Sequence, residues 1–135
     1  MLKKYLALLI ILIATSLSAC QGNTPSTNID LELSDFRMTP DRLIVPAGSE
    51  ISLHVSNTGS ITHDFTVMEI GANVGDRYDQ EDQNNVYWEI EVRSGETMTV
   101  QFLSPDEPGT YQIVCSMPGH VQAGMLGSLE VVSRK

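Results

Sequence analysis

Apolar and polar residues alternate one by one through most of the chain after residue 28, which is typical of β-strands with one buried face. Eight segments show this alternation, at residues 29–33, 43–45, 51–55, 65–67, 86–92, 98–102, 111–115 and 129–131. Turn-forming residues separate these segments at intervals of roughly 8 to 12 residues, and no segment has a convincing helical period. The pattern therefore predicts an all-β single domain of about eight strands, folded as a sandwich or barrel.

Residues 71–85 interrupt the alternation with an acidic, amide-rich stretch, GANVGDRYDQEDQNN. This composition predicts a solvated loop or a short irregular helix. A flap that docks a partner protein is the functional alternative for the same stretch.

The N-terminal residues 1–19 have the layout of a secretory signal peptide. Lys3 and Lys4 precede the apolar run Leu6–Ile13, which is shorter than the about 20 residues of a membrane-spanning helix. A short transmembrane anchor is the alternative. The sequence Leu17–Cys20 (LSAC) resembles the lipobox of bacterial lipoproteins. That resemblance implies cleavage before Cys20 and attachment of lipid to its sulfur; ordinary cleavage with a free Cys20 is the other possibility.

The predicted signal peptide and lipobox set the domain boundaries. Residues 20–28 are small and polar, and we expect a lipid-anchored tether, followed by one folded domain at residues 29–135. The mature protein would be extracytoplasmic, on the periplasmic or cell-surface side, and held to a membrane by its lipid.

The charge of the mature chain limits its partners. Without residues 1–19 it has 6 basic and 17 acidic residues, a net charge of about −11. Such a surface repels nucleic acid phosphates, so we expect no nucleic acid partner. It favours association with a basic protein surface.

Three residues with metal-binding side chains lie close together in the sequence: Cys115, His120 and Met125. A thiolate, an imidazole and a thioether are soft or borderline ligands, and together they select copper over calcium, magnesium or manganese. If Cys20 carries lipid, Cys115 has no disulfide partner, so burial or metal ligation has to account for it. His63 supplies a second imidazole, because it shares the core-facing side of the strand at 65–67. Two histidines, one cysteine and an axial methionine form a blue copper electron-transfer site.

Other residues near this motif are weaker candidates for the metal. Met117 precedes the turn Pro118–Gly119, which would have to bring it back to the metal, whereas Gln122 offers an oxygen as an alternative axial ligand. His54 alternates with apolar neighbours and is expected to face solvent.

The ligand pattern resembles that of the cupredoxin family. The shared features are a distant histidine, the motif Cys-x4-His-x4-Met, Tyr111 in the preceding strand and Gly-x-Leu-x-Val in the last strand. The two spacings of four are most similar to those of auracyanin or rusticyanin. The resemblance covers about residues 29–132. It implies a Greek-key β-sandwich in which His63, Cys115, His120 and Met125 bind one type 1 copper ion.

One position departs from the family pattern. The residue after the first histidine is commonly asparagine in cupredoxins, where it braces the ligand loop, and here it is Asp64. An ionised carboxylate close to the site would favour Cu(II) and lower the reduction potential, but the side chain could also point outward.

These features predict a monomeric electron carrier between extracytoplasmic redox proteins, not an enzyme. A copper ion whose ligands all come from protein has no exchangeable position for a substrate. A copper carrier that delivers its ion to an oxidase is the alternative, and a metal-free adhesive or structural lipoprotein is a third.

The ligand loop is also the expected docking surface. The resemblance implies that the His120 ring connects copper to the surface, and the loop around it is apolar on an acidic chain. We therefore expect a cytochrome or a membrane oxidoreductase complex to dock there, through Met117, Pro118, Val121, Ala123 and Leu126.

Overall fold

The computed structural model describes residues 24–134. The predicted signal peptide, the lipobox and Cys20 lie outside these residues, and so does the first part of the predicted tether. Among residues 24–134, no helix is both long enough and apolar enough to cross a bilayer.

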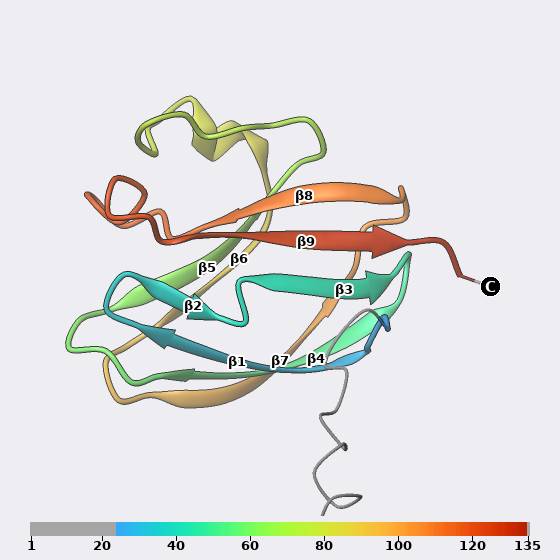
Figure 1. Cartoon of the computed structure of the whole chain (residues 1–135), viewed down its shortest axis with the longest axis horizontal. Coiled ribbons are helices and arrows are strands. Elements are labelled where there is room, and N and C mark those ends of the chain that lie inside the picture. The colour runs from blue at the N-terminus through green and yellow to red at the C-terminus, as the bar shows by residue number, and fades with distance from the viewer. Residues whose placement is uncertain (1–23, 135) are drawn as a thin grey trace, which may run out of the picture.

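The described residues form two β-sheets that pack face to face, as Figure 1 shows. One sheet has the strand order β2–β1–β4–β7 and the other β3–β9–β8–β5–β6, with β1 parallel to β4 and β3 parallel to β9. The strands are β1 (Asn28–Ser34), β2 (Arg37–Thr39), β3 (Arg42–Pro46), β4 (Glu50–Asn57), β5 (His63–Met68), β6 (Val86–Val92), β7 (Thr97–Leu103), β8 (Gly109–Val114) and β9 (Leu126–Val132). The predicted β-sandwich is thus confirmed, with nine strands in this part of the chain.

The core lies between the two sheets and is built by the alternation seen in the sequence. Residues along β1 and β4 are buried at every second position, because successive side chains of a strand point to opposite faces. The register places apolar residues opposite one another, as in the β4–β7 pairs Ile51–Phe102 and Leu53–Val100. Ile51, Leu53 and Phe102 are buried, and full burial of such a side chain contributes about 1.5–3 kcal/mol to stability, whereas Val100 is half-buried.

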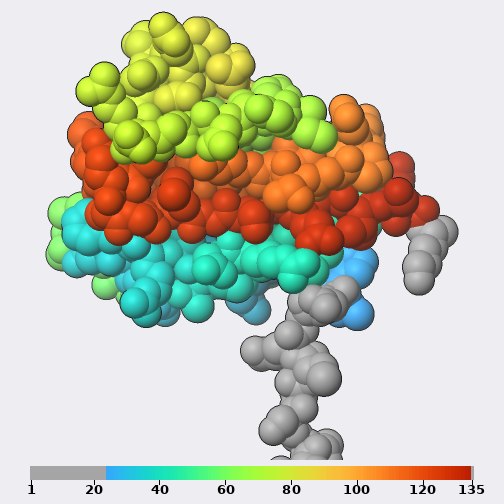
Figure 2. Space-filling view, turned by 45° about the horizontal axis from the view of Figure 1, so that its top comes forward, coloured from blue at the N-terminus to red at the C-terminus, as the bar shows by residue number. Residues whose placement is uncertain are grey.

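Strand β5 departs from the alternation, because all six of its residues are buried. The segment between β5 and β6 packs against the outer side of β5 and β8, where Val74 joins Met68 and Val114. Figure 2 shows this yellow-green segment lying over the orange and red part of the chain. Val74 in that segment is 3% exposed and joins Met68, Val114 and Val121 in a second apolar cluster. The expectation of a solvated loop at 71–85 therefore holds for most of these residues but is wrong for Val74. The segment ends in η1 (Asp82–Asn85), a single 3-10 turn.

The sequence pattern did not predict strand β2. It forms a hairpin with β1 through a turn in which Ser34 pairs with Arg37. Phe36 in this turn has a left-handed backbone conformation, with φ of 61°, which is uncommon for a residue other than glycine. The β1–β2, β4–β5 and β8–β9 connections meet at one end of the sandwich, at the left in Figure 1.

Candidate metal centre

The β8–β9 loop brings Cys115, His120 and Met125 together. The Cys115 N–H donates to the Met125 carbonyl at 3.2 Å, and the Met125 N–H donates to the His120 carbonyl at 2.9 Å. Gly119 and Gly124, with φ of 86° and 87°, form the turns between these residues in a conformation that glycine adopts without strain. The segment from Cys115 to Met125 therefore forms a closed loop, whose two ends are joined by the hydrogen bond between Cys115 and Met125.

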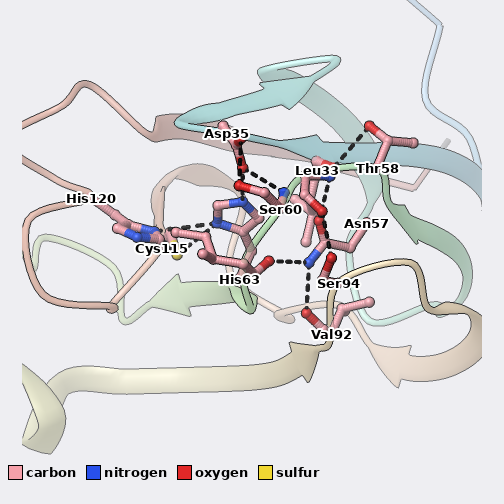
Figure 3. A network of polar contacts seen from close by, with 12 residues as sticks. Leu33, Asp35, Asn57, Thr58, Ser60, His63, Val92, Ser94, Cys115 and His120 are labelled. Carbon is pink, nitrogen blue, oxygen red and sulfur yellow. Dashed lines mark hydrogen bonds and ion pairs between the residues drawn. The ribbon is translucent and has the colours of Figure 1, made fainter.

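His63 reaches the same place from the other end of the sequence. It is the first residue of β5, and its side chain is fully buried, as the alternation with Phe65 and Val67 predicted. Its Nδ1 lies 3.3 Å from Nδ1 of His120 and 3.9 Å from Sγ of Cys115, and Sγ lies 3.0 Å from Nδ1 of His120. Figure 3 shows the three side chains pointing toward one another.

These separations suit a single bound metal ion. With metal–ligand bonds of about 2.0–2.3 Å, as zinc forms with nitrogen and sulfur, three donors arranged trigonally around one centre lie roughly 3.5–3.8 Å apart. Two of the three separations are close to this range, and the Cys115–His120 separation is shorter by less than 1 Å. The three residues are the metal-ligand cluster within residues 24–134, with donor atoms within 4.8 Å of one another.

The candidates for a fourth ligand differ in how deeply their side chains are buried. Met125 is fully buried in the core cluster that also contains Cys115, whereas Gln122 is exposed. Met117 is half-buried against the same cluster. His54 is exposed, as predicted, and its Nδ1 lies 2.8 Å from the Thr99 hydroxyl.

The protonation of the buried ligands depends on their surroundings. Burial, and after it the Asp64 carboxylate, raise the pKa of the Cys115 thiol to about 11. A bound cation would stabilise the thiolate in this position. Burial, followed by the nearby His63, lowers the pKa of His120, so the neutral ring that a metal requires is favoured.

Asp64 points inward and braces the ligand loop. Its Oδ1 accepts hydrogen bonds from the Ser116 N–H at 2.7 Å and the Thr66 hydroxyl at 2.9 Å, and its Oδ2 accepts one from the Ser116 hydroxyl at 2.6 Å. The Asp64 N–H also points at Sγ of Cys115, at 3.4 Å. Of the two orientations left open by the sequence, the structure therefore shows the inward one.

Two residues of the β1–β2 turn contact the histidines, and neither was identified from the sequence. Oδ1 of Asp35 lies 3.6 Å from Nε2 of His63. The Phe36 ring packs edge-on against His120, with ring centroids 5.2 Å apart, and remains 46% exposed. No local sequence signal links residues 35 and 36 to positions 63 and 120, because the contacts depend on how β1 and β5 pack.

The expected docking residues differ in their exposure. Pro118, Ala123 and Leu126 are exposed and Met117 is half-buried. Val121 is only 5% exposed, because it packs in the second apolar cluster, so its expected place on the surface is wrong.

Comparisons with known proteins agree with this architecture. A family model described as the cupredoxin-like domain matches residues 5–126. Auracyanin-B of Chloroflexus aurantiacus is 28% identical over 133 residues, covering 82% of this chain and 54% of that protein. The chain thus spans about half the length of this relative.

Solved structures show the same fold. Dithionite-reduced auracyanin from Roseiflexus castenholzii has a TM-score of 0.69 at 25% identity, covering 81% of this chain and 99% of that chain. Reduced rusticyanin has a TM-score of 0.56 at 17% identity, covering 94% and 96%. A multicopper oxidase has a TM-score of 0.55 at 18% identity, covering 80% of this chain and 39% of the oxidase chain. The similarity to auracyanin and rusticyanin that the loop spacing predicted is confirmed, and the chain belongs to the cupredoxin-like domain family.

Proposed function

We propose that this chain is a type 1 blue copper protein that transfers single electrons, with one copper ion held by His63, Cys115, His120 and Met125. The observation that carries the proposal is the set of three inward-facing donor atoms within 4.8 Å of one another, all on buried side chains. One of the auracyanins with this fold is described as a blue copper protein.

The arrangement favours electron transfer over catalysis. Bound copper would supply a one-electron couple between Cu(I) and Cu(II). The chain supplies four donors, so a substrate has no exchangeable position. The ligand loop is tied by its own hydrogen bonds and by Asp64, so the donors can keep their places in both oxidation states.

Copper loading tests this function. We expect the protein with Cu(II) to develop an intense blue absorption band that Cys115→Ser abolishes, because the thiolate is responsible for the colour. His54→Gln, which changes an exposed histidine outside the cluster, is the matched control and should leave the band intact. A copper-loaded protein without a blue band would contradict the proposal. Rapid loss of copper to a competing acceptor would instead identify a copper carrier.

We further propose that a redox protein with a basic surface docks over His120. Phe36, Pro118, Ala123 and Leu126 offer exposed apolar side chains around this histidine or on its loop. The remainder of the mature chain is strongly acidic, so charge complementarity favours a basic partner such as a cytochrome. A small apolar contact also suits a transient electron-transfer complex.

Electron-transfer rates with a basic cytochrome test the docking surface. Leu126→Asp should slow the reaction while leaving the blue spectrum unchanged. Leu103→Asp is the control. Leu103 is also exposed, but it pairs with Glu50 at the start of β4, at the end of the sandwich away from the β4–β5 connection and His63. Equal effects of the two variants would place the contact elsewhere. The rate should also fall as ionic strength rises.

We also propose that the mature protein is an extracytoplasmic lipoprotein. Support comes from the apolar run before LSAC and from Cys20, both outside the described residues. An electron carrier held at a membrane surface by its lipid would stay close to membrane-bound redox complexes.

A further inference from the structure

The outer nitrogen of His63 is a buried polar atom without a hydrogen-bond partner. Among residues 24–134, nothing lies within hydrogen-bonding distance of its Nε2, although the side chain is fully buried. A metal at Nδ1 requires the ring proton to be on Nε2, and such a proton normally has an acceptor. The surroundings of Nε2 should therefore contain a group able to accept this hydrogen bond.

Asp35 is placed to be that acceptor. Its Oδ1 lies 3.6 Å from Nε2, so a shift of less than about 1 Å would form a charge-assisted hydrogen bond of ordinary length. The carboxylate is held in place by Ser60, whose N–H donates to Oδ1 and whose hydroxyl donates to Oδ2, both at 2.9 Å. These hydrogen bonds, the backbone one foremost, lower the pKa of Asp35, so its side chain is ionised at neutral pH.

Gly59 provides the space for this approach. A Cβ at position 59 would lie 2.6 Å from Oδ1 of Asp35 and 2.8 Å from Nε2 of His63, so any other residue would push between the two groups. The Gly59 N–H donates to Oδ1 of Asn57 at 2.9 Å. The Asn57 amide in turn donates to the carbonyls of Ile61 and Val92, at 2.8 and 2.9 Å. Figure 3 shows this network connecting the β4–β5 loop with the histidine.

We propose that Asp35 is a positioning residue of the metal centre, which accepts the Nε2–H of His63 and so directs Nδ1 toward Cys115 and His120. Its negative charge also stabilises Cu(II) relative to Cu(I) and lowers the reduction potential. The first role, the hydrogen bond to His63, can be tested without bound copper. The second role, the effect on the reduction potential, rests on the proposed function.

Metal-free protein tests the first role. Long-range proton–nitrogen NMR at about pH 8.5, where an ordinary imidazole is neutral, reports which ring nitrogen of His63 carries the proton. We expect the Nε2–H form to dominate in the wild type and to fall severalfold relative to the Nδ1–H form in Asp35→Ala. Asp35→Asn should keep the Nε2–H form, because an amide oxygen can still accept. An unchanged tautomer ratio in Asp35→Ala would overturn the proposal, whether or not the protein binds copper.

Copper-loaded protein tests the second role. Asp35→Asn removes the charge and should shift the Cu(II)/Cu(I) equilibrium about tenfold toward Cu(I), which is about 59 mV for one electron. Gly59→Ala should shift it in the same direction by separating Asp35 from His63. Asp30→Asn is the control, because it removes the same charge from an exposed position on β1. Equal shifts for Asp35→Asn and Asp30→Asn would show a general charge effect and overturn this role.

Discussion

The brace formed by Asp64 leads to a prediction about stability. In Asp64→Ala, three donors lose their acceptor: the Ser116 N–H, the Ser116 hydroxyl and the Thr66 hydroxyl. Each buried donor left unpaired costs about 1–3 kcal/mol. Thr66 is fully buried, but Ser116 is half-buried and can reach water. Taking each of the two Ser116 donors at about 1 kcal/mol and the Thr66 hydroxyl at about 1–3 kcal/mol, we expect a loss of about 3–5 kcal/mol in the free energy of unfolding.

An opposing effect comes from Glu91, which lies directly opposite Asp64 in the β5–β6 ladder. Removing one of two like charges in this position relieves a repulsion of about 0.2–1 kcal/mol. Glu91 is exposed, so solvent screening keeps this gain small. The lost hydrogen bonds therefore decide the sign, and the variant should be destabilised.

Urea unfolding of the metal-free protein measures this effect. The midpoint should fall in Asp64→Ala without a change in the slope. Asp64→Asn should lose less than about 1.5 kcal/mol, because its amide oxygen can still accept from the Ser116 N–H. Asp30→Ala, at an exposed site, is the control and should stay within about 0.5 kcal/mol of wild type. A free energy of unfolding for Asp64→Ala that matches this control would refute the bracing role.

Three further predictions concern the axial ligand, the anchor and the second apolar cluster. Met125→Gln should retain copper but lower the reduction potential measured by redox titration, because an oxygen donor favours Cu(II); an unchanged potential would move the axial position to another residue. Cys20→Ser should release the protein from the membrane fraction while the blue spectrum stays intact, and mass spectrometry of a mature terminus without acyl chains would contradict the anchor. Val74→Ala should reduce the free energy of unfolding by about 1.5–2.5 kcal/mol, whereas Ala at the exposed neighbour Asn73 should have little effect; equal midpoints in urea would show that the cluster adds no stability.

Eight of the nine described strands and the three members of the metal-ligand cluster could be predicted from the sequence. Alternation of apolar and polar residues reports directly which face of a strand is buried, because side chains alternate across the pleat. The burial of His63 beside Phe65 follows from the same rule. The grouping of Cys115, His120 and Met125 could also be predicted, because the hydrogen bonds that close their loop join residues that are close in sequence.

The surroundings of the two histidines depend on how distant segments pack, and the sequence pattern did not predict them. Asp35 and Phe36 reach His63 and His120 from a distant hairpin turn, and no local pattern encodes contacts over such separations. Val121 is buried because a segment from another part of the chain folds over it, although its own loop resembles a surface loop in sequence. Periodicity describes how each strand presents its side chains, whereas the packing of separate segments determines which of those side chains meet.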